Sequence, residues 1–346
     1  MAPLLELRNV SKIFGGGMFN RSNVTVAVDD ISFTISEDNP EITTIAGESG
    51  SGKSTMARLL LGVTSPTYGT VFYKGKALAT MTRKERKEFR REVQPIFQDP
   101  FESYNPFYKV DHVLHAPAKN FQIADSQAAR TTMIEDALMM VGLQPDETLG
   151  RYPHQLSGGQ RQRVMVARAL LLKPRIILAD EPVSMVDASL RATILESIQK
   201  LNKELGISVV YITHDLTTAY QISNNIMIMY KGSVVEAGAM QQVIQDPQHP
   251  YTQLLVDSIP QPDPKIAWGS ETFVGLANEG GGALDGCKFA DRCPNVMDIC
   301  NGQVPSLYQT RPHTVVNCFL YKDSEVMENP DIASAFVEQD KIPDVV

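Results

Sequence analysis

A glycine-rich run has the composition and spacing of a loop that binds phosphate. It follows the pattern G-x-x-x-x-G-K-[ST] and lies between a short apolar run and a helical stretch. Its residues are Gly47, Glu48, Ser49, Gly50, Ser51, Gly52, Lys53 and Ser54, and Thr55 comes next. Glycines let backbone N–H groups converge on phosphate oxygens, and the N-terminus of the following helix adds partial positive charge. An ordinary glycine-rich turn is the alternative, and the strand–loop–helix context disfavours it.

The same loop predicts a role for its polar side chains. We expect Lys53 to hold the β- and γ-phosphates of a nucleoside triphosphate, because its ammonium group follows the last glycine. The Ser54 hydroxyl is expected to coordinate Mg2+, and Thr55 is placed to reach a phosphate near the start of the helix. The sequence therefore predicts a triphosphate site that contains magnesium.

Two adjacent carboxylates, Asp180 and Glu181, follow an apolar run at residues 176–179. Open α/β sheets bind their ligands at the carboxyl ends of strands, which is where this pair is expected to lie. Asp180 suits magnesium coordination, and Glu181 suits accepting a proton from an attacking water or polarising it. A solvated turn is the alternative for such a pair alone. The phosphate-binding loop upstream favours the chemical role.

A second segment with glycines stands at the predicted start of another helix, where an anion can bind. It comprises Leu156, Ser157, Gly158, Gly159 and Gln160, with Arg161 and Arg163 directly after it. Enzymes that carry only a phosphate-binding loop have no need of it.

Length and charge limit the kinds of protein that this chain can be. At roughly 100 to 200 residues per domain, 346 residues suggest two domains. The formal net charge of −8 gives no support for nucleic-acid binding, so an anionic ligand has to be captured locally. Apolar runs stay shorter than the roughly 18 residues of a membrane span, and the N-terminus does not resemble an export signal. We expect a cytoplasmic location.

The pattern along the chain predicts an α/β protein with a small appended part. Strands are expected at residues 4–10, 24–35, 42–46, 176–179 and 207–213, and helices at 55–61, 83–92, 126–142, 159–172 and 190–205. Residues 83–92 form a charged, mainly basic stretch that is typical of a solvated helix. Alternation of helices and strands fades after residue 238, and residues 259–286 are rich in proline and glycine. The expected parts are residues 1–238, 239–322 and an acidic tail at 323–346.

The segment LSGGQ at residues 156–160 resembles the signature of ABC ATPases, and the other motifs match that family in order up to about residue 235. The resemblance implies a phosphate-loop α/β core, an antiparallel β subdomain, a helical signature subdomain and hydrolysis of ATP. It also implies a head-to-tail pair, in which residues 157–160 cover the ATP held by a second ATPase chain. That second chain is another copy of this chain or a similar ATPase, and a paralogous subunit is the expected one.

The resemblance also implies individual roles. Phe14 matches the aromatic residue that stacks on adenine, and Gln98 matches the glutamine that senses magnesium and nucleotide and links the site to a transmembrane partner. Glu181 matches the catalytic glutamate, residues 184–187 resemble the D-loop, and His214 matches the histidine that contacts the γ-phosphate.

Residues 248–255, QHPYTQLL, resemble the HPYT segment of the oligopeptide and dipeptide branch of ABC importers, and QPIFQDP with the NP at residues 105–106 also fits that branch. This resemblance implies two transmembrane permease subunits, an extracytoplasmic solute-binding protein and a peripheral position at the cytoplasmic face of the inner membrane. Peptides are the expected solutes, with oligosaccharides or nickel as alternatives. A soluble ABC ATPase of DNA repair or translation is a remote alternative, because the chain has a single cassette and no sustained heptads.

The cysteines, Cys287, Cys293, Cys300 and Cys318, are all near the C-terminal end. Chemistry leaves three interpretations open: four thiolates for a [4Fe-4S] cluster, four for zinc, or free or disulfide-linked thiols. The spacing C-x5-C-x6-C-x17-C is wider than the cysteine pairs of structural zinc sites. The branch resemblance implies an iron–sulfur cluster, with a structural or redox-sensing role.

Overall fold

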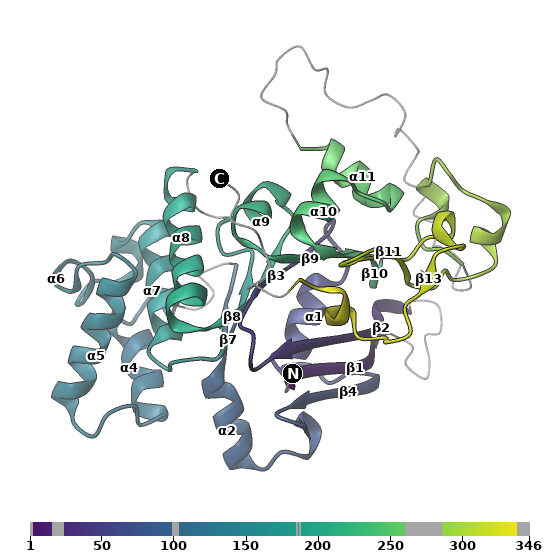
Figure 1. The fold of residues 1–346 in the computed structure, drawn as a ribbon. Coiled ribbons are helices and arrows are strands. Elements are labelled where there is room, and N and C mark those ends of the chain that lie inside the picture. The colour runs from purple at the N-terminus through teal and green to yellow at the C-terminus, as the bar shows by residue number, and fades with distance from the viewer. Residues whose placement is uncertain are drawn as a thin grey trace. The chain divides into compact units, whose positions relative to one another are not determined.

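The computed structural model describes residues 3–15, 24–98, 104–184, 186, 188–259 and 286–337, with only the backbone described at 188–190. The chain divides into two compact units (Figure 1). Unit 1 comprises residues 1–80 and 213–346, and unit 2 comprises residues 81–212. Each is described by itself.

Unit 1 begins with the antiparallel sheet that the alternating N-terminal pattern predicts. Its strands have the order β2-β1-β4-β5. Their bounds are Pro3–Phe14 for β1, Thr25–Ser36 for β2, Tyr68–Tyr73 for β4 and Lys76–Ala77 for β5. Leu5 and Leu7, two residues apart on the same side of β1, are buried and face the core.

The strand that precedes the phosphate-binding loop is β3, Ile42–Ala46. All five of its residues are buried, which explains why its sequence is an apolar run without alternation. Strand β3 pairs in parallel with β9, Asn225–Tyr230, and β9 pairs antiparallel with β10, Ser233–Ala239. Helix α1, Lys53–Leu60, starts at the end of the loop, which confirms the predicted order of strand, loop and helix.

The remaining helices of unit 1 are short. They are α9, Leu216–Ile222, α10, Met240–Gln245, and α11, Pro250–Asp257. Asp215 accepts the backbone N–H groups of Thr217 and Thr218 and so caps the first turn of α9.

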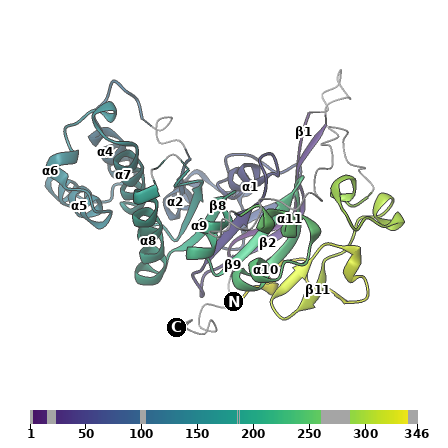
Figure 2. The same ribbon diagram turned by 90° about the horizontal axis from the view of Figure 1, so that it is seen from above.

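Unit 2 holds three parallel strands in the order β8-β7-β6, together with a group of helices. The strands are β6, Val93–Ile96, β7, Ile176–Asp180, and β8, Ser208–Thr213. The helices are α2, Arg83–Glu92, α4, Asp111–Asn120, α5, Gln127–Met140, α6, Pro145–Thr148, α7, Gly158–Leu170, and α8, Ala188–Leu205. Helices α4 and α5 pack against α7 and against each other (Figure 2).

The charged stretch at residues 83–92 is the helix that the sequence predicts. Thr82 and Glu85 form a capping box at the start of α2, in which each side chain bonds the backbone of the other residue. Phe89 is the one buried residue of α2, so the basic side chains of this helix lie toward solvent.

The C-terminal segment joins the sheet of unit 1. Strand β12, Thr314–Val316, pairs antiparallel with β10 and with β11, Tyr308–Arg311, and β11 pairs with β13, Glu325–Val326. Short 3-10 turns complete the segment: η4, Ala290–Arg292, η5, Asp298–Asn301, η6, Phe319–Tyr321, and η7, Ile332–Ala335. The sequence does not predict these strands, because strands of two to four residues are too short to have a readable period.

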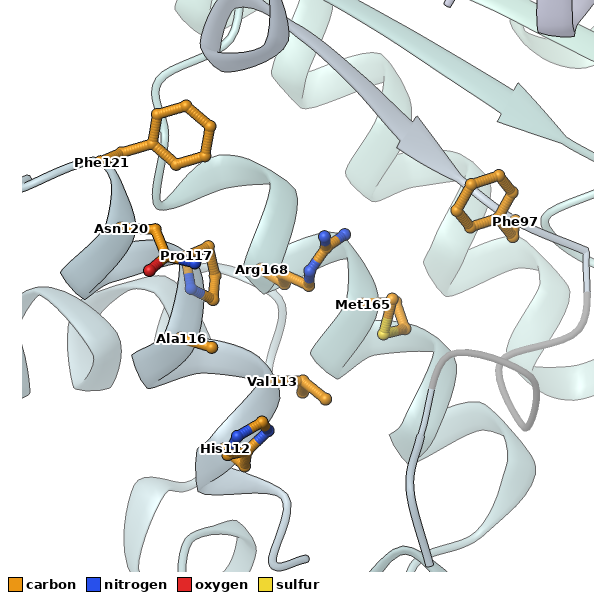
Figure 3. A pocket seen from close by; sticks show the side chains of 9 residues that line it. All are labelled: Phe97, His112, Val113, Ala116, Pro117, Asn120, Phe121, Met165 and Arg168. Carbon is orange, nitrogen blue, oxygen red and sulfur yellow. The ribbon is translucent and has the colours of Figure 1, made fainter. Parts of the chain in front are cut away.

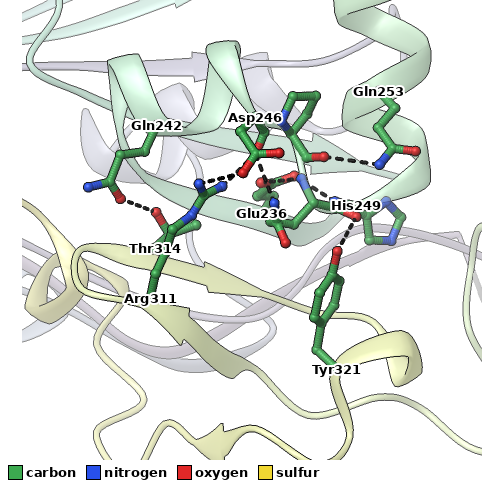
Figure 4. A network of polar contacts seen from close by, with 10 residues as sticks. Glu236, Gln242, Asp246, His249, Gln253, Arg311, Thr314 and Tyr321 are labelled. Carbon is green, nitrogen blue, oxygen red and sulfur yellow. Dashed lines mark hydrogen bonds and ion pairs between the residues drawn. The ribbon is translucent and has the colours of Figure 1, made fainter.

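A buried carboxylate fixes the chain between α10 and α11. Glu236 of β10 has no solvent exposure, and its two carboxylate oxygens accept the backbone N–H groups of Gln248 and His249, both at 2.9 Å (Figure 4). Burial raises the pKa of Glu236 to about 7. The hydrogen bonds from the two N–H groups lower this pKa, but their effect is smaller than that of burial. Burial lowers the pKa of His249 to about 3, so its ring is neutral, and Nδ1 accepts the N–H of Tyr251 at 3.0 Å.

The C-terminal segment holds the same stretch from the other side (Figure 4). Arg311 Nη1 pairs with Asp246 at 2.7 Å, and the Thr314 hydroxyl donates to Gln242 at 2.7 Å. The Tyr321 hydroxyl donates to the carbonyl of Gln248 at 3.2 Å.

Glu236→Gln is expected to change how stability depends on pH. The pKa of Glu236 is about 7 in the folded chain and near 4.5 in the unfolded chain, so the folded state holds the extra proton between these values. Glu236 therefore stabilises the fold most below pH 4.5, and this contribution is lost as pH rises through 7. The stability advantage of the wild type over Glu236→Gln should shrink by roughly 1–3 kcal/mol between pH 5 and pH 8 in thermal unfolding of both proteins. A difference that stays constant with pH would contradict the raised pKa.

Candidate nucleotide-binding site

The phosphate-binding loop lies very close to two neighbouring strands. A Cβ atom on Gly47 would stand 2.2 Å from the carbonyl oxygen of Met229, and one on Gly52 would stand 2.1 Å from that of Ala27. Both glycines also have positive φ angles, 148° and 107°. Only glycine fits these two positions, because any side chain would collide with backbone that cannot move aside.

Lys53 bridges the loop from within. Its side chain is 6% exposed, and Nζ donates to the carbonyl oxygens of Gly47 at 2.7 Å and Glu48 at 2.8 Å. The Ser51 hydroxyl is buried and finds no hydrogen-bond partner in the part of the chain that the structure describes. A buried ammonium beside a buried hydroxyl that lacks an acceptor suits an anion with several oxygens, which fits the predicted triphosphate. Ser54 is exposed and Thr55 is half-buried, so a ligand can reach both.

Two other predicted residues belong to unit 1. Phe14 ends β1 with its ring 44% exposed, and the ammonium of Lys12 lies 5.1 Å from the ring centroid. His214 follows β8 and is exposed. An exposed aromatic face and an exposed imidazole can both contact a bound nucleotide.

In unit 2 the structure brings Gln98 and Glu181 together. The Gln98 amide Nε2 donates to Glu181 Oε2 at 3.0 Å across 83 residues of sequence. Asp180 is the last residue of β7, as the sequence predicts, and Glu181 directly follows it. Glu181 has a φ of 44°, and its N–H donates to the Ile212 carbonyl at 2.8 Å. This unusual backbone, held by a neighbouring strand, fixes the direction of the carboxylate.

The glycine segment at residues 157–160 starts α7, as predicted. The Ser157 hydroxyl accepts the N–H of Gln160 at 3.2 Å, and Gln160 Oε1 accepts the N–H of Ser157 at 3.0 Å. Ser157 and Gln160 thus form a capping box, a pattern that the S-x-x-Q spacing itself indicates. Gly158 is half-buried and Gly159 is buried. Of the predicted D-loop, residues 185 and 187 lie outside the described residues.

Beside Gln98 the structure contains a groove that the sequence does not predict. It measures about 550 Å3, and Figure 3 shows side chains from three parts of unit 2 around it. Its lining is Phe97, His112, Val113, Ala116, Pro117, Asn120, Phe121, Met165 and Arg168. Phe97 is 44% exposed, and Nη1 of Arg168 is buried with no hydrogen-bond partner among the described residues. The lining comes from the residue after β6, from α4 with the residue that follows it, and from α7, so no local pattern in the sequence indicates it.

The cysteine thiols gather from separate segments. Cys300 and Cys318 are buried, Cys287 and Cys293 are half-buried, and all four are free thiols. Burial and, to a smaller extent, the other three thiols raise the pKa of Cys318 to about 11. The N–H of Cys287 donates to the Cys300 carbonyl at 2.8 Å. Within the described residues no three His, Cys, Asp or Glu side chains are arranged to hold a metal ion.

No helix in the described ranges is both long and apolar enough to cross a membrane.

Comparison with known proteins gives two family matches. Residues 28–184 match the family described as "ABC transporter", and residues 235–300 match "Oligopeptide/dipeptide transporter, C-terminal region". The chain is 38% identical to the putative oligopeptide transport ATP-binding protein YkfD of Bacillus subtilis over 94% of this chain and 98% of that protein. It is 37% identical to the oligopeptide transport ATP-binding protein AppF of the same organism over 92% and 97%.

Solved structures are similar as well, and they confirm the predicted fold. The ATP-binding cassette MJ0796, in a dimeric post-hydrolysis state bound to ADP and Pi, aligns with a TM-score of 0.61 and 31% identity over 68% of this chain and 98% of that chain. The cbiO1 protein of Clostridium perfringens aligns with a TM-score of 0.60 and 25% identity over 71% and 92%. The chain therefore belongs to the ABC transporter ATPase family, on the branch that carries the oligopeptide/dipeptide transporter C-terminal region.

Proposed function

We propose that this chain hydrolyses ATP to power an importer of peptides, of the dipeptide or oligopeptide type, across the cytoplasmic membrane. One observation carries the proposal: the ATPase motifs and the oligopeptide/dipeptide C-terminal region occur together in one chain. Relatives that share almost its whole length are named for oligopeptide transport. This favours peptides over oligosaccharides or nickel.

In this proposal Lys53 and Ser51 bind the terminal phosphates from inside the loop, and Gly50, Gly52 and Thr55 contribute backbone and hydroxyl contacts. Ser54, Gln98 and Asp180 hold Mg2+, which supplies charge neutralisation for the phosphates when bound. Phe14 stacks on adenine, and His214 contacts the γ-phosphate.

Glu181 is the base that orients and polarises the attacking water. The hydrogen bond from Gln98 supports this role, because an amide donor on Oε2 holds the carboxylate in one direction. Gln98 thus acts on the base, and anything that moves Gln98 changes the geometry of Glu181.

The ATPase works as a pair with a second ABC ATPase chain, a paralogous subunit in this proposal. Residues 157–160 cover the ATP of the other chain. The capping box directs Ser157 and Gln160 at one another, so the N-terminus of α7 keeps a fixed shape for the partner's phosphates. ATP then favours the closed pair, and loss of the γ-phosphate releases it.

The groove beside Gln98 is the docking site for a short cytoplasmic helix of a permease subunit. Its wall of apolar side chains, with one buried guanidinium nitrogen of Arg168, suits an amphipathic helix with an acceptor group for that nitrogen. Phe97 lies in the wall and directly precedes Gln98, so an occupant contacts the residue next to the one that bonds Glu181. Two such subunits and an extracytoplasmic solute-binding protein complete the importer, and the ATPase is peripheral at the cytoplasmic face of the inner membrane.

The four cysteines hold an iron–sulfur cluster with a structural or redox-sensing role. Four thiolates are the usual ligand set of a [4Fe-4S] cluster, and all four cysteines of the segment are free thiols. No three His, Cys, Asp or Glu side chains among the described residues are arranged to hold a metal ion, so the proposal rests on the number of cysteines and on the branch resemblance.

Peptides are expected to raise ATP hydrolysis by the assembled transporter. The measurement is phosphate release by the full complex in lipid, with the cognate binding protein loaded with a peptide library, with oligosaccharides or with Ni2+. Stimulation by peptides alone supports the proposal. Stimulation by a sugar or by nickel alone would assign the importer to another solute.

Glu181→Gln is expected to keep ATP binding and to slow hydrolysis by about 10²- to 10⁴-fold, because a neutral amide cannot accept the proton of the water. Phosphate release and nucleotide affinity are measured on the same preparation. Glu204→Gln, on the exposed end of α8, is the matched control and should turn over normally. Normal hydrolysis by Glu181→Gln would remove Glu181 from its role.

Iron analysis tests the cysteines. Protein purified without oxygen should be brown and contain about four iron atoms and four acid-labile sulfides per chain. Serine replacement of all four cysteines should remove the colour. Colourless wild-type protein that takes up no iron on reconstitution would contradict the cluster.

A further inference from the structure

Glu48, the second residue of the phosphate-binding loop, is held at both its side chain and its backbone. Arg292 donates from Nη1 to Oε2 at 2.9 Å and from Nη2 to Oε1 at 3.0 Å, which makes a two-pronged ion pair. The N–H of Glu48 donates to the Tyr251 hydroxyl at 2.8 Å. Neither contact takes part in the hydrolysis proposed above.

Arg292 is itself held in place. Its guanidinium carbon lies 5.7 Å from the ring centroid of Phe289 and 5.8 Å from that of Tyr230. Phe289 is 1% exposed and packs edge-on against Tyr230, with 5.2 Å between the ring centroids. The neighbouring Lys288 pairs with Asp29 at 2.8 Å. These contacts hold the Arg292 side chain in one position, whereas an isolated surface ion pair joins two mobile side chains.

Arg292 lies in the same segment of the chain as the cysteines. Arg292 ends η4, between Cys287 and Cys293, and the N–H of Cys293 donates to Ala290 at 3.2 Å within the same turn. The N–H of Cys287 donates a hydrogen bond to the carbonyl oxygen of Cys300. Any contact that holds the chain in place between Cys287 and Cys293 therefore also holds Arg292 in place.

Two physical effects connect Arg292 to ATP. First, Glu48 supplies one of the two carbonyls that accept from the Lys53 ammonium, so a fixed Glu48 keeps that ammonium in place. Second, an unpaired carboxylate in a loop that binds phosphate would repel the ligand, and the guanidinium cancels that charge.

We propose that Arg292 is a positioning residue of the nucleotide site, through which the cysteine segment, residues 286–337, sets the affinity for ATP. The proposal rests on the proposed function only in taking ATP as the ligand of the loop.

Arg292→Ala is expected to raise the KM and the Kd for ATP by about three- to tenfold. The kcat should stay within about twofold, because Glu181 and Gln98 are untouched. Arg292→Lys should recover part of the loss, since it restores the charge without the fork. Adding Glu48→Gln to Arg292→Ala should restore much of the affinity by removing the unpaired carboxylate. Binding of a fluorescent ATP analogue to the full chain gives Kd, and turnover of the assembled transporter gives KM and kcat.

Arg311→Ala is the matched control, because it removes an arginine–carboxylate pair from the same segment away from the loop. Its KM should equal that of the wild type, and melting temperatures report whether each variant folds. An unchanged KM in Arg292→Ala, or an equal rise in KM in Arg311→Ala, would overturn the proposal. Lys53→Ala separates the two proposals: if it retains full ATP affinity, the loop is not the ATP site and the proposed function fails.

Discussion

The phosphate-binding loop packs against the backbone of β2 and β9 so closely that two of its positions have no room for a side chain. This contact fixes the loop in unit 1. The loop also carries the Lys53 ammonium and the buried Ser51 hydroxyl, which are donors suited to a ligand with several oxygens. A chain of net charge −8 can hold a polyanion only through such a local concentration of donors.

Three hydrogen bonds connect strand β10 to this loop. Glu236 accepts the N–H of His249, the ring of His249 accepts the N–H of Tyr251, and the Tyr251 hydroxyl accepts the N–H of Glu48. The sequence HPYT therefore has a structural meaning in this protein, because its histidine and tyrosine are the residues that make these contacts. The buried ring of His249 can serve only because desolvation keeps it neutral.

Local patterns predict the parts of this structure that are local. The loop, β3, β7, α1 and α2 follow from apolar runs, glycines and a capping box, and Asp180 with Glu181 follow from the end of a buried strand. The family resemblance implies separate roles for Gln98 and Glu181, but the hydrogen bond between them, across 83 residues, is not predicted from the sequence. No local sequence pattern predicts the ion pair between Arg292 and Glu48. The spacing of the cysteines along the chain likewise does not predict the distances between their thiols.

The contact between Arg292 and Glu48 also orders events in time. Arg292 follows Glu48 by 244 residues in the sequence, so the ribosome synthesises the loop long before the arginine that pairs with it. Until then the carboxylate of Glu48 lacks this ion pair. In the proposal made for Arg292, the affinity for ATP reaches its full value only in chains whose cysteine segment has been synthesised and has docked.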